Sequence, residues 1–197
     1  MNVALNPALD PVRVASAFTR DGRVHIPQIL TKDSAACLHS LVRESDFALR
    51  EGLHYLYDGH VLSRDGEAYP DPAHDLSAVA AFLNSGPFLD FARCVTGNPG
   101  IAFADAQATR YRPGHFLSQH DDAPGRVAAY VLNLTPRWRP DWGGALLFSD
   151  RPGHFSGGYL PAFNALNIVA AKHMVGFVSP FAGAHRLSIA GWFRSPL

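Results

Sequence analysis

The chain has 197 residues, of which 47% are hydrophobic and 17% charged, and its 17 basic and 17 acidic side chains cancel. This composition predicts one folded domain, or one domain with a helical extension, and argues against disorder. A chain without excess charge is not expected to bind nucleic acid or a membrane surface, and no apolar stretch approaches the roughly 20 residues of a membrane span. Two cysteines and the absence of a signal-peptide pattern favour a cytoplasmic protein with neither a disulfide scaffold nor a cysteine zinc site.

The first hundred residues contain both helix and strand patterns and predict a helical or mixed N-terminal support region. Helices are expected where a capping residue or a proline precedes an apolar periodicity, as at Asp10-Pro11 and at Thr31. A strand is expected over residues 23–30, although Pro27 weakens it because proline cannot donate to a ladder. The expected helices span residues 11–19, 31–42, 76–84 and 87–95.

Beyond the Asn98-Pro99-Gly100 break the chain consists of short alternating or apolar runs between turn residues. Eight strands at this spacing predict a sandwich, barrel or jelly roll, so the fold class is mainly β with flanking helices. No linker separates the support region, residues 1–100, from the β region, residues 101–197, and we expect one compact unit. The expected strands span residues 101–111, 115–120, 127–134, 144–148, 155–160, 166–171, 173–178 and 186–193.

The first candidate metal ligands are His120 and Asp122. They would point to the same face of a strand because side chains alternate. An imidazole and a carboxylate at this spacing can share one metal ion. A further histidine would complete the two-histidine, one-carboxylate triad that leaves open positions on Fe(II). With 10 histidines and 17 acidic residues, one such pair is expected by chance, so the pattern needs support from its surroundings.

That support comes from an ordered set of segments around the pair. A strand–turn–strand run over residues 111–117 leads into it, a strand over 126–134 and a tryptophan-bearing loop closed by 142–148 follow, and the chain ends with residues 172–175 and 184–193. From about Ala102 to Phe193, this order resembles the iron(II)/2-oxoglutarate-dependent oxygenases of the prolyl hydroxylase family. The resemblance implies a double-stranded β-helix, a jelly-roll core that agrees with the strand-rich second half.

The resemblance implies that His120, Asp122 and His173 are the three iron ligands. Two other histidines compete for the third position. His185 would face away from its neighbour Arg186 on a regular strand, and His154 lies in a turn-rich stretch, so His173 is favoured over both.

For the cosubstrate, the resemblance implies that Arg186 binds the far carboxylate of 2-oxoglutarate. A guanidinium is always charged and can hold a carboxylate with two parallel hydrogen bonds. Ser188, on the same strand face, could donate another hydrogen bond, and Tyr111 matches a tyrosine that often contacts the cosubstrate. Asn133 stands where many relatives have a further tyrosine, which leaves open whether it replaces that contact.

The resemblance is nearest to the ribosomal-protein prolyl hydroxylases and implies a dioxygenase that hydroxylates a prolyl residue in a protein or peptide and releases succinate and CO2. Fe(II), 2-oxoglutarate and O2 would be required, with ascorbate as a candidate accessory. Those relatives carry a second oxygenase-like domain, and we expect this chain to be too short to include one. Without the docking surface of such a domain, a free amino acid or another small molecule is an alternative substrate. Trp138, Arg139 and Trp142 are the candidate substrate contacts. A non-catalytic β-roll binding module and a cupin-like metalloenzyme that does not use 2-oxoglutarate are the rival readings, and the oligomeric state is left open.

Overall fold

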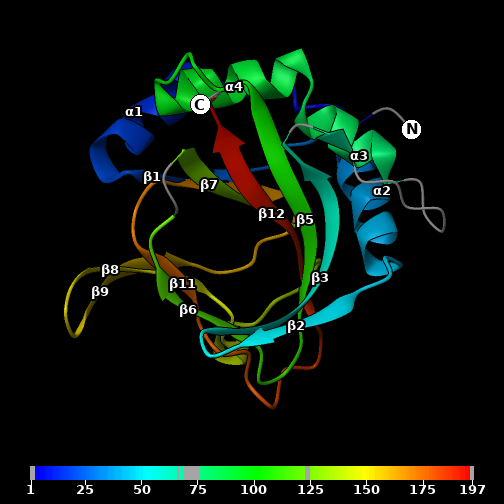
Figure 1. The fold of residues 1–197 in the computed structure, drawn as a ribbon, viewed down its shortest axis with the longest axis vertical. Helices are drawn as coiled ribbons and strands as arrows, with labels where there is room; N and C mark the ends of the chain where they lie inside the picture. Colours follow the sequence, from blue (N-terminus) through cyan, green and yellow to red (C-terminus); the bar gives the residue numbers. More distant parts are fainter. Residues whose placement is uncertain (1–2, 66, 69–75, 123–124, 196–197) are drawn as a thin grey trace.

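The computed structural model describes residues 3–65, 67–68, 76–122 and 125–195. In this part of the chain, no helix is both long enough and apolar enough to cross a membrane. Helices cover one side of a curved sheet, and a roll of strands lies on the opposite side (Figure 1).

The helices begin and end close to where their capping residues predict. The carboxylate of Asp10 accepts hydrogen bonds from the backbone N–H groups of Val12 and Arg13, and Pro11 occupies the first turn, where its missing N–H costs nothing. The Thr31 hydroxyl likewise accepts from Ser34 N–H. The described helices are α1 (Pro11–Asp21), α2 (Lys32–Arg43), α3 (Ser77–Leu83), α4 (Gly86–Thr96) and the 3-10 turn η1 (Pro140–Trp142).

The first hundred residues also contribute strands. The expected strand over 23–30 is shorter than predicted and ends at Pro27, which has no N–H to continue the ladder. A hairpin that the sequence reading missed follows α2. The strands of this half are β1 (Arg23–Pro27), β2 (Ala48–Gly52), β3 (Tyr55–Arg64) and β4 (Glu67–Ala68).

All eight strands predicted for the second half are present, which confirms a mainly antiparallel jelly-roll fold with flanking helices. Their alternating or continuous apolar runs fit a sheet with one or both faces covered. The strands are β5 (Phe103–Tyr111), β6 (Phe116–His120), β7 (Arg126–Asn133), β8 (Leu146–Arg151), β9 (His154–Tyr159), β10 (Ala165–Val169), β11 (His173–Val175) and β12 (Arg186–Arg194).

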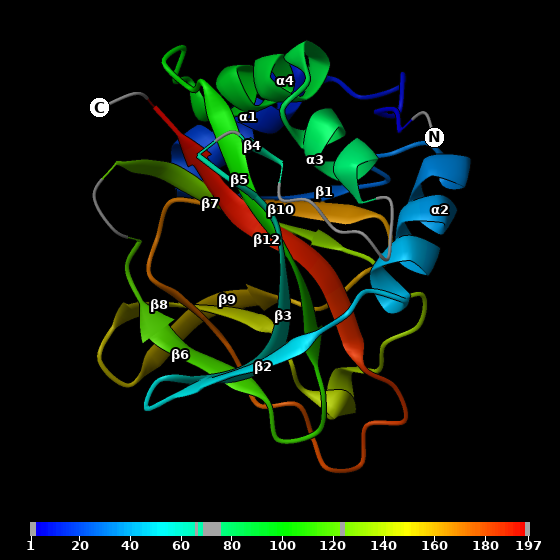
Figure 2. The same cartoon turned by 45° about the vertical axis from the view of Figure 1, so that its right-hand side comes forward.

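The described strands form one sheet in the order β1-β10-β7-β12-β5-β3-β6-β11-β8-β9, with β2 and β4 also paired to β3. Strand β3 pairs with both β5 and β6, so it joins the part of the sheet that carries the helices to the part that closes the roll. Strand β12 lies between β5 and β7 in the middle of the first part (Figure 2).

Two apolar clusters hold these layers together. The larger one fills the space between the helices and the outer face of the sheet and includes Phe88, Tyr130 and Phe193, whose rings contact one another. The smaller one lies inside the roll and includes Tyr111 and Leu146. The interior of the roll is therefore only partly filled by hydrocarbon, and the polar site lies there.

Candidate metal centre and cosubstrate cavity

Strands β6 and β11 bring the two histidines of the predicted triad together. His120 and His173 are direct partners in the antiparallel register, and their ring centroids lie 4.4 Å apart. Asp122 follows β6, and the ligand atoms of all three residues lie within 4.8 Å of one another. Strand pairing therefore makes neighbours in space of two ligands that are 53 positions apart in sequence.

The hydrogen bonds of the histidines suit metal binding. The Nδ1 atom of His120 lies 2.9 Å from the carbonyl of Ser118, and Nδ1 of His173 lies 2.9 Å from that of Ala171. A carbonyl only accepts, so each Nδ1 must carry the proton, and each Nε2 then offers its lone pair to a metal. Burial lowers the pKa of His173, which favours the neutral form that binds metal.

The other two candidate histidines lie elsewhere. His154 is exposed and pairs with Asp150 at 2.7 Å. His185 is exposed on the opposite side of β12, where it lines a surface pocket with Arg110 and Arg137. His173 is therefore confirmed as the third ligand over both alternatives.

A cavity of about 330 Å³ inside the roll is lined by both histidine ligands and by the predicted cosubstrate residues Tyr111, Arg186 and Ser188. Tyr111 and Arg186 are register partners on β5 and β12, and the guanidinium carbon lies 5.0 Å from the centre of the tyrosine ring. Pairing of neighbouring strands thus places a fixed cation in the same cavity as the metal ligands.

The environment of Arg186 is unusual for a cation. Its side chain is only 2% exposed, and its Nε has no hydrogen-bond partner among the residues that the structure describes. Burial lowers the pKa of Arg186, and Tyr111 opposes that shift. Burial likewise raises the pKa of Tyr111. A buried guanidinium without a neighbouring carboxylate favours an anionic ligand, because an unpaired buried charge is costly.

The neighbouring polar residues are less available. Ser188 is fully buried, and its hydroxyl shares a 2.7 Å hydrogen bond with that of Thr109. Asn133 donates from Nδ2 to the carbonyl of Ala165 at 3.3 Å and does not line the cavity, whereas Val131 on the same strand does. Whether Asn133 contacts the cosubstrate stays a prediction.

The predicted substrate contacts are not brought to this cavity. Trp138 donates from its indole to the carbonyl of Gly143 at 2.9 Å and packs edge-on against Trp142. Arg139 is exposed and pairs with Asp141. None of the three candidates lines the cavity, so their role in substrate binding stays a prediction.

The sequence reading also missed residues that do line the cavity. Tyr57 on β3 stacks on Tyr111 with ring centroids 5.5 Å apart. Trp192 donates its indole N–H to Asp122, and Arg126 lies over its ring. The alternation of Tyr55 and Tyr57 in β3 is a signal that could have indicated the first of these, but Trp192 and Arg126 carry no local signal.

A sequence profile of the 2OG-Fe(II) oxygenase superfamily matches residues 106–194, the segment that carries the triad and Arg186. The chain is an enzyme of this superfamily. It uses Fe(II), held by His120, Asp122 and His173, with 2-oxoglutarate as cosubstrate. No curated protein sequence matches it.

Several solved structures share the fold of this oxygenase. A prolyl-4-hydroxylase of Pseudomonas putida aligns with a TM-score of 0.75 at 20% identity, covering 95% of this chain and all of the other. A prolyl hydroxylase of Trichoplax adhaerens, bound to a hypoxia inducible factor peptide fragment, gives 0.73 at 16% identity over 94% and 90% of the two chains. SnoN, an alpha ketoglutarate dependent epimerase of nogalamycin biosynthesis, gives 0.70 at 12% identity over 94% and 83%.

Proposed function

We propose that Arg186 binds the far carboxylate of 2-oxoglutarate and that Tyr111 and Ser188 complete this end of the cosubstrate site. The observation that carries the proposal is a guanidinium only 2% exposed, in the same cavity as the iron ligands, without a carboxylate partner among the described residues. The planar fork of the arginine suits a carboxylate, and the anion would neutralise the buried charge.

We propose further that the oxygenase hydroxylates a prolyl residue in a protein or peptide and releases succinate and CO2. Fe(II) and 2-oxoglutarate, when bound, would supply the oxidising chemistry with O2 as the oxidant, so that one oxygen atom enters proline and the other enters succinate. The chain supplies the rest: Arg186 orients the cosubstrate, Nε2 of each histidine stays unprotonated for the metal, and the walls exclude water. Aromatic walls contributed by Tyr55, Tyr57 and Trp192 suit a pyrrolidine ring.

The fold of two prolyl hydroxylases supports the prolyl assignment as an analogy, since fold alone does not fix a substrate. The alternative is a free amino acid or another small molecule. It is favoured by the modest cavity of about 330 Å³, and the fold also occurs in an epimerase of nogalamycin biosynthesis.

The test measures succinate formation by the Fe(II)-loaded protein with proline-containing peptides, free proline and the other amino acids. Each product is then examined for a gain of 16 mass units. Stimulation by a proline-containing peptide, with the added oxygen on proline, is the expected result. Stimulation by free proline or by another amino acid alone would support the small-molecule alternative instead.

The role of the Trp138 loop can be tested in the same assay. If Trp138 or Trp142 contacts substrate, as predicted, replacement by alanine should reduce substrate-coupled turnover more than uncoupled 2-oxoglutarate decarboxylation. An equal loss of both rates would assign the loop a packing role.

A further inference from the structure

The carboxylate ligand Asp122 is held by a residue on another strand. The indole Nε1–H of Trp192, on β12, donates to Oδ1 of Asp122 at 2.5 Å. Asp122 is 70 residues away in sequence and lies just beyond β6. With Oδ1 engaged by the indole, Oδ2 is the carboxylate oxygen left for a metal ion.

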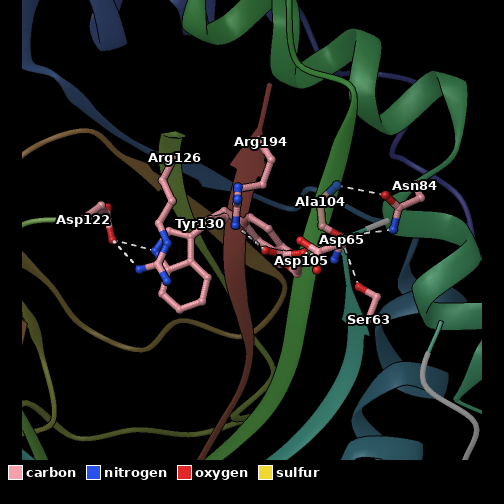
Figure 3. A network of polar contacts seen from close by, with 10 residues as sticks. Ser63, Asp65, Asn84, Ala104, Asp105, Asp122, Arg126, Tyr130 and Arg194 are labelled. Atoms are coloured by element: carbon pink, nitrogen blue, oxygen red, sulfur yellow. Dashed lines mark hydrogen bonds and ion pairs between the residues drawn. The ribbon is translucent and has the colours of Figure 1, made fainter. Parts of the chain in front are cut away.

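Arg126 lies over the face of the same indole. Its guanidinium carbon lies 3.7 Å from the centre of the Trp192 ring, a cation–π contact at short range. Its Nη1 lies 3.9 Å from the same Oδ1 of Asp122, too far for a hydrogen bond but close enough for attraction (Figure 3).

A second arginine shows why Arg126 takes this position. Arg126 and Arg194 are register partners on β7 and β12, and like charges in such pairs repel. Arg194 donates to Asp105 at 3.1 Å, so that carboxylate is already engaged (Figure 3). Arg126 lies instead over the indole face and close to Asp122.

We propose that Trp192 and Arg126 are positioning residues of the metal centre. The indole N–H fixes Asp122 so that one oxygen faces the iron, and Arg126 holds the indole in the orientation that makes this hydrogen bond. The inference rests on the iron site but not on the identity of the substrate. A ring needed only for packing would not require an N–H donor, so the two roles predict different results for phenylalanine at this position.

The test titrates metal-free protein with Co(II) and follows both the affinity and the visible d–d absorption, which depends on the coordination geometry. Trp192→Phe keeps an aromatic ring under Arg126 and removes the N–H together with part of the ring system. We expect its Co(II) affinity to fall by about 10–100-fold, as for other outer contacts of metal ligands, with an altered absorption. Equal affinity and an unchanged spectrum in Trp192→Phe would overturn the proposal.

Trp138→Phe is the matched control, because Trp138 also donates its indole N–H, in this case to the carbonyl of Gly143. Its Co(II) affinity and spectrum should be those of the unmodified protein. If both phenylalanine variants lose affinity equally, the effect is a general consequence of losing an indole, and the proposal is wrong. If the unmodified protein binds no Co(II), the assignment of the metal site itself fails.

Arg126→Lys tests the second half of the proposal and remains available if Trp192→Phe does not fold. Lysine keeps the charge but cannot stack as a plane, so we expect a loss of about twofold to fivefold. In the double variant, Arg126→Lys should add no further loss, because the arginine acts through the N–H that Trp192→Phe has removed. An additive loss would show that Arg126 acts independently of the indole.

Discussion

At its start, strand β12 is buried on both faces, but the two faces have opposite chemistry. On the outer face, Leu187, Ile189 and Phe193 join the large cluster beneath the helices. On the inner face, Arg186 and Ser188 are no more exposed, yet they line the cavity that holds the histidine ligands. Burial alone therefore does not separate core from site. What marks the inner face is the buried charge of Arg186, whose Nε has no hydrogen-bond partner among the described residues.

On the inner face, removing the charge of Arg186 should give the largest effect, which we expect on cosubstrate affinity and not on stability. Arg186→Met should weaken 2-oxoglutarate binding by about 3–5 kcal/mol, because the cosubstrate carboxylate would lose its buried cation. Without cosubstrate, the free energy of unfolding should stay the same or rise, since an unpaired buried charge has gone. Calorimetric titration of metal-loaded protein and urea unfolding measure the two quantities.

Arg110→Met provides the control for this experiment. Arg110 is the strand neighbour of Leu187 on β5 and pairs with Asp58 on the outer side, so its loss should leave cosubstrate affinity unchanged. Unchanged affinity in Arg186→Met as well would remove the main support for the proposed cosubstrate site.

The outer face should show the reverse behaviour. Ile189 is fully buried in the large cluster, and Ile189→Ala should lower the free energy of unfolding by roughly 2–4 kcal/mol through lost transfer energy and a residual cavity. Cosubstrate affinity of the folded protein should change little, as measured below the unfolding transition. A large loss of affinity with little loss of stability would show that the two faces are not separable.

The sequence was most informative where periodicity and capping act locally. The eight strands of the second half follow from apolar runs between turns, and the start of α1 follows from Asp10 and Pro11. The metal ligands could be predicted because the spacing of His120 and Asp122 fits one strand face and the resemblance supplied the distant His173.

The remaining features depend on pairing between distant strands. Tyr57 reaches the cavity because β3 pairs with both β5 and β6, and its alternation with Tyr55 indicates a shared strand face but not what that face lines. Trp192 reaches Asp122 across 70 residues, and no local pattern indicates that contact. The candidate substrate loop at Trp138 was predicted from its aromatic and cationic residues and its place near the predicted site, and the structure shows how its two tryptophans pack.

On the outer side of β3, the contribution of Asp58 to stability should depend on pH. Burial alone would raise the pKa of Asp58, but hydrogen bonds from Arg110 and Arg112 outweigh it and hold the pKa below its ordinary value. Its contribution to stability is therefore complete above the unfolded pKa of about 3.9 and is lost as the pH falls through the lower folded value.

Asp58→Asn should accordingly cost about 1–2 kcal/mol of unfolding free energy at pH 7, because two charge-assisted hydrogen bonds are replaced by weaker ones. The cost should shrink as the pH falls below about 4. Urea unfolding of both proteins across this pH range measures the difference. A cost that is the same at acidic and neutral pH would assign Asp58 a role that does not depend on its charge.

Ser188 should give the smallest effect, because its hydroxyl is shared between the chain and the proposed ligand. Its 2.7 Å hydrogen bond with Thr109 already satisfies one direction of the hydroxyl, so Ser188→Ala removes at most one further bond to 2-oxoglutarate. We expect cosubstrate affinity to fall by about 0.5–1.5 kcal/mol, well below the effect of Arg186→Met. Thr109→Val is the matched control, since it also breaks the shared hydrogen bond but leaves the Ser188 hydroxyl in place. If both variants lose affinity equally, the hydroxyl pair supports the cavity wall, and Ser188 does not donate to the cosubstrate.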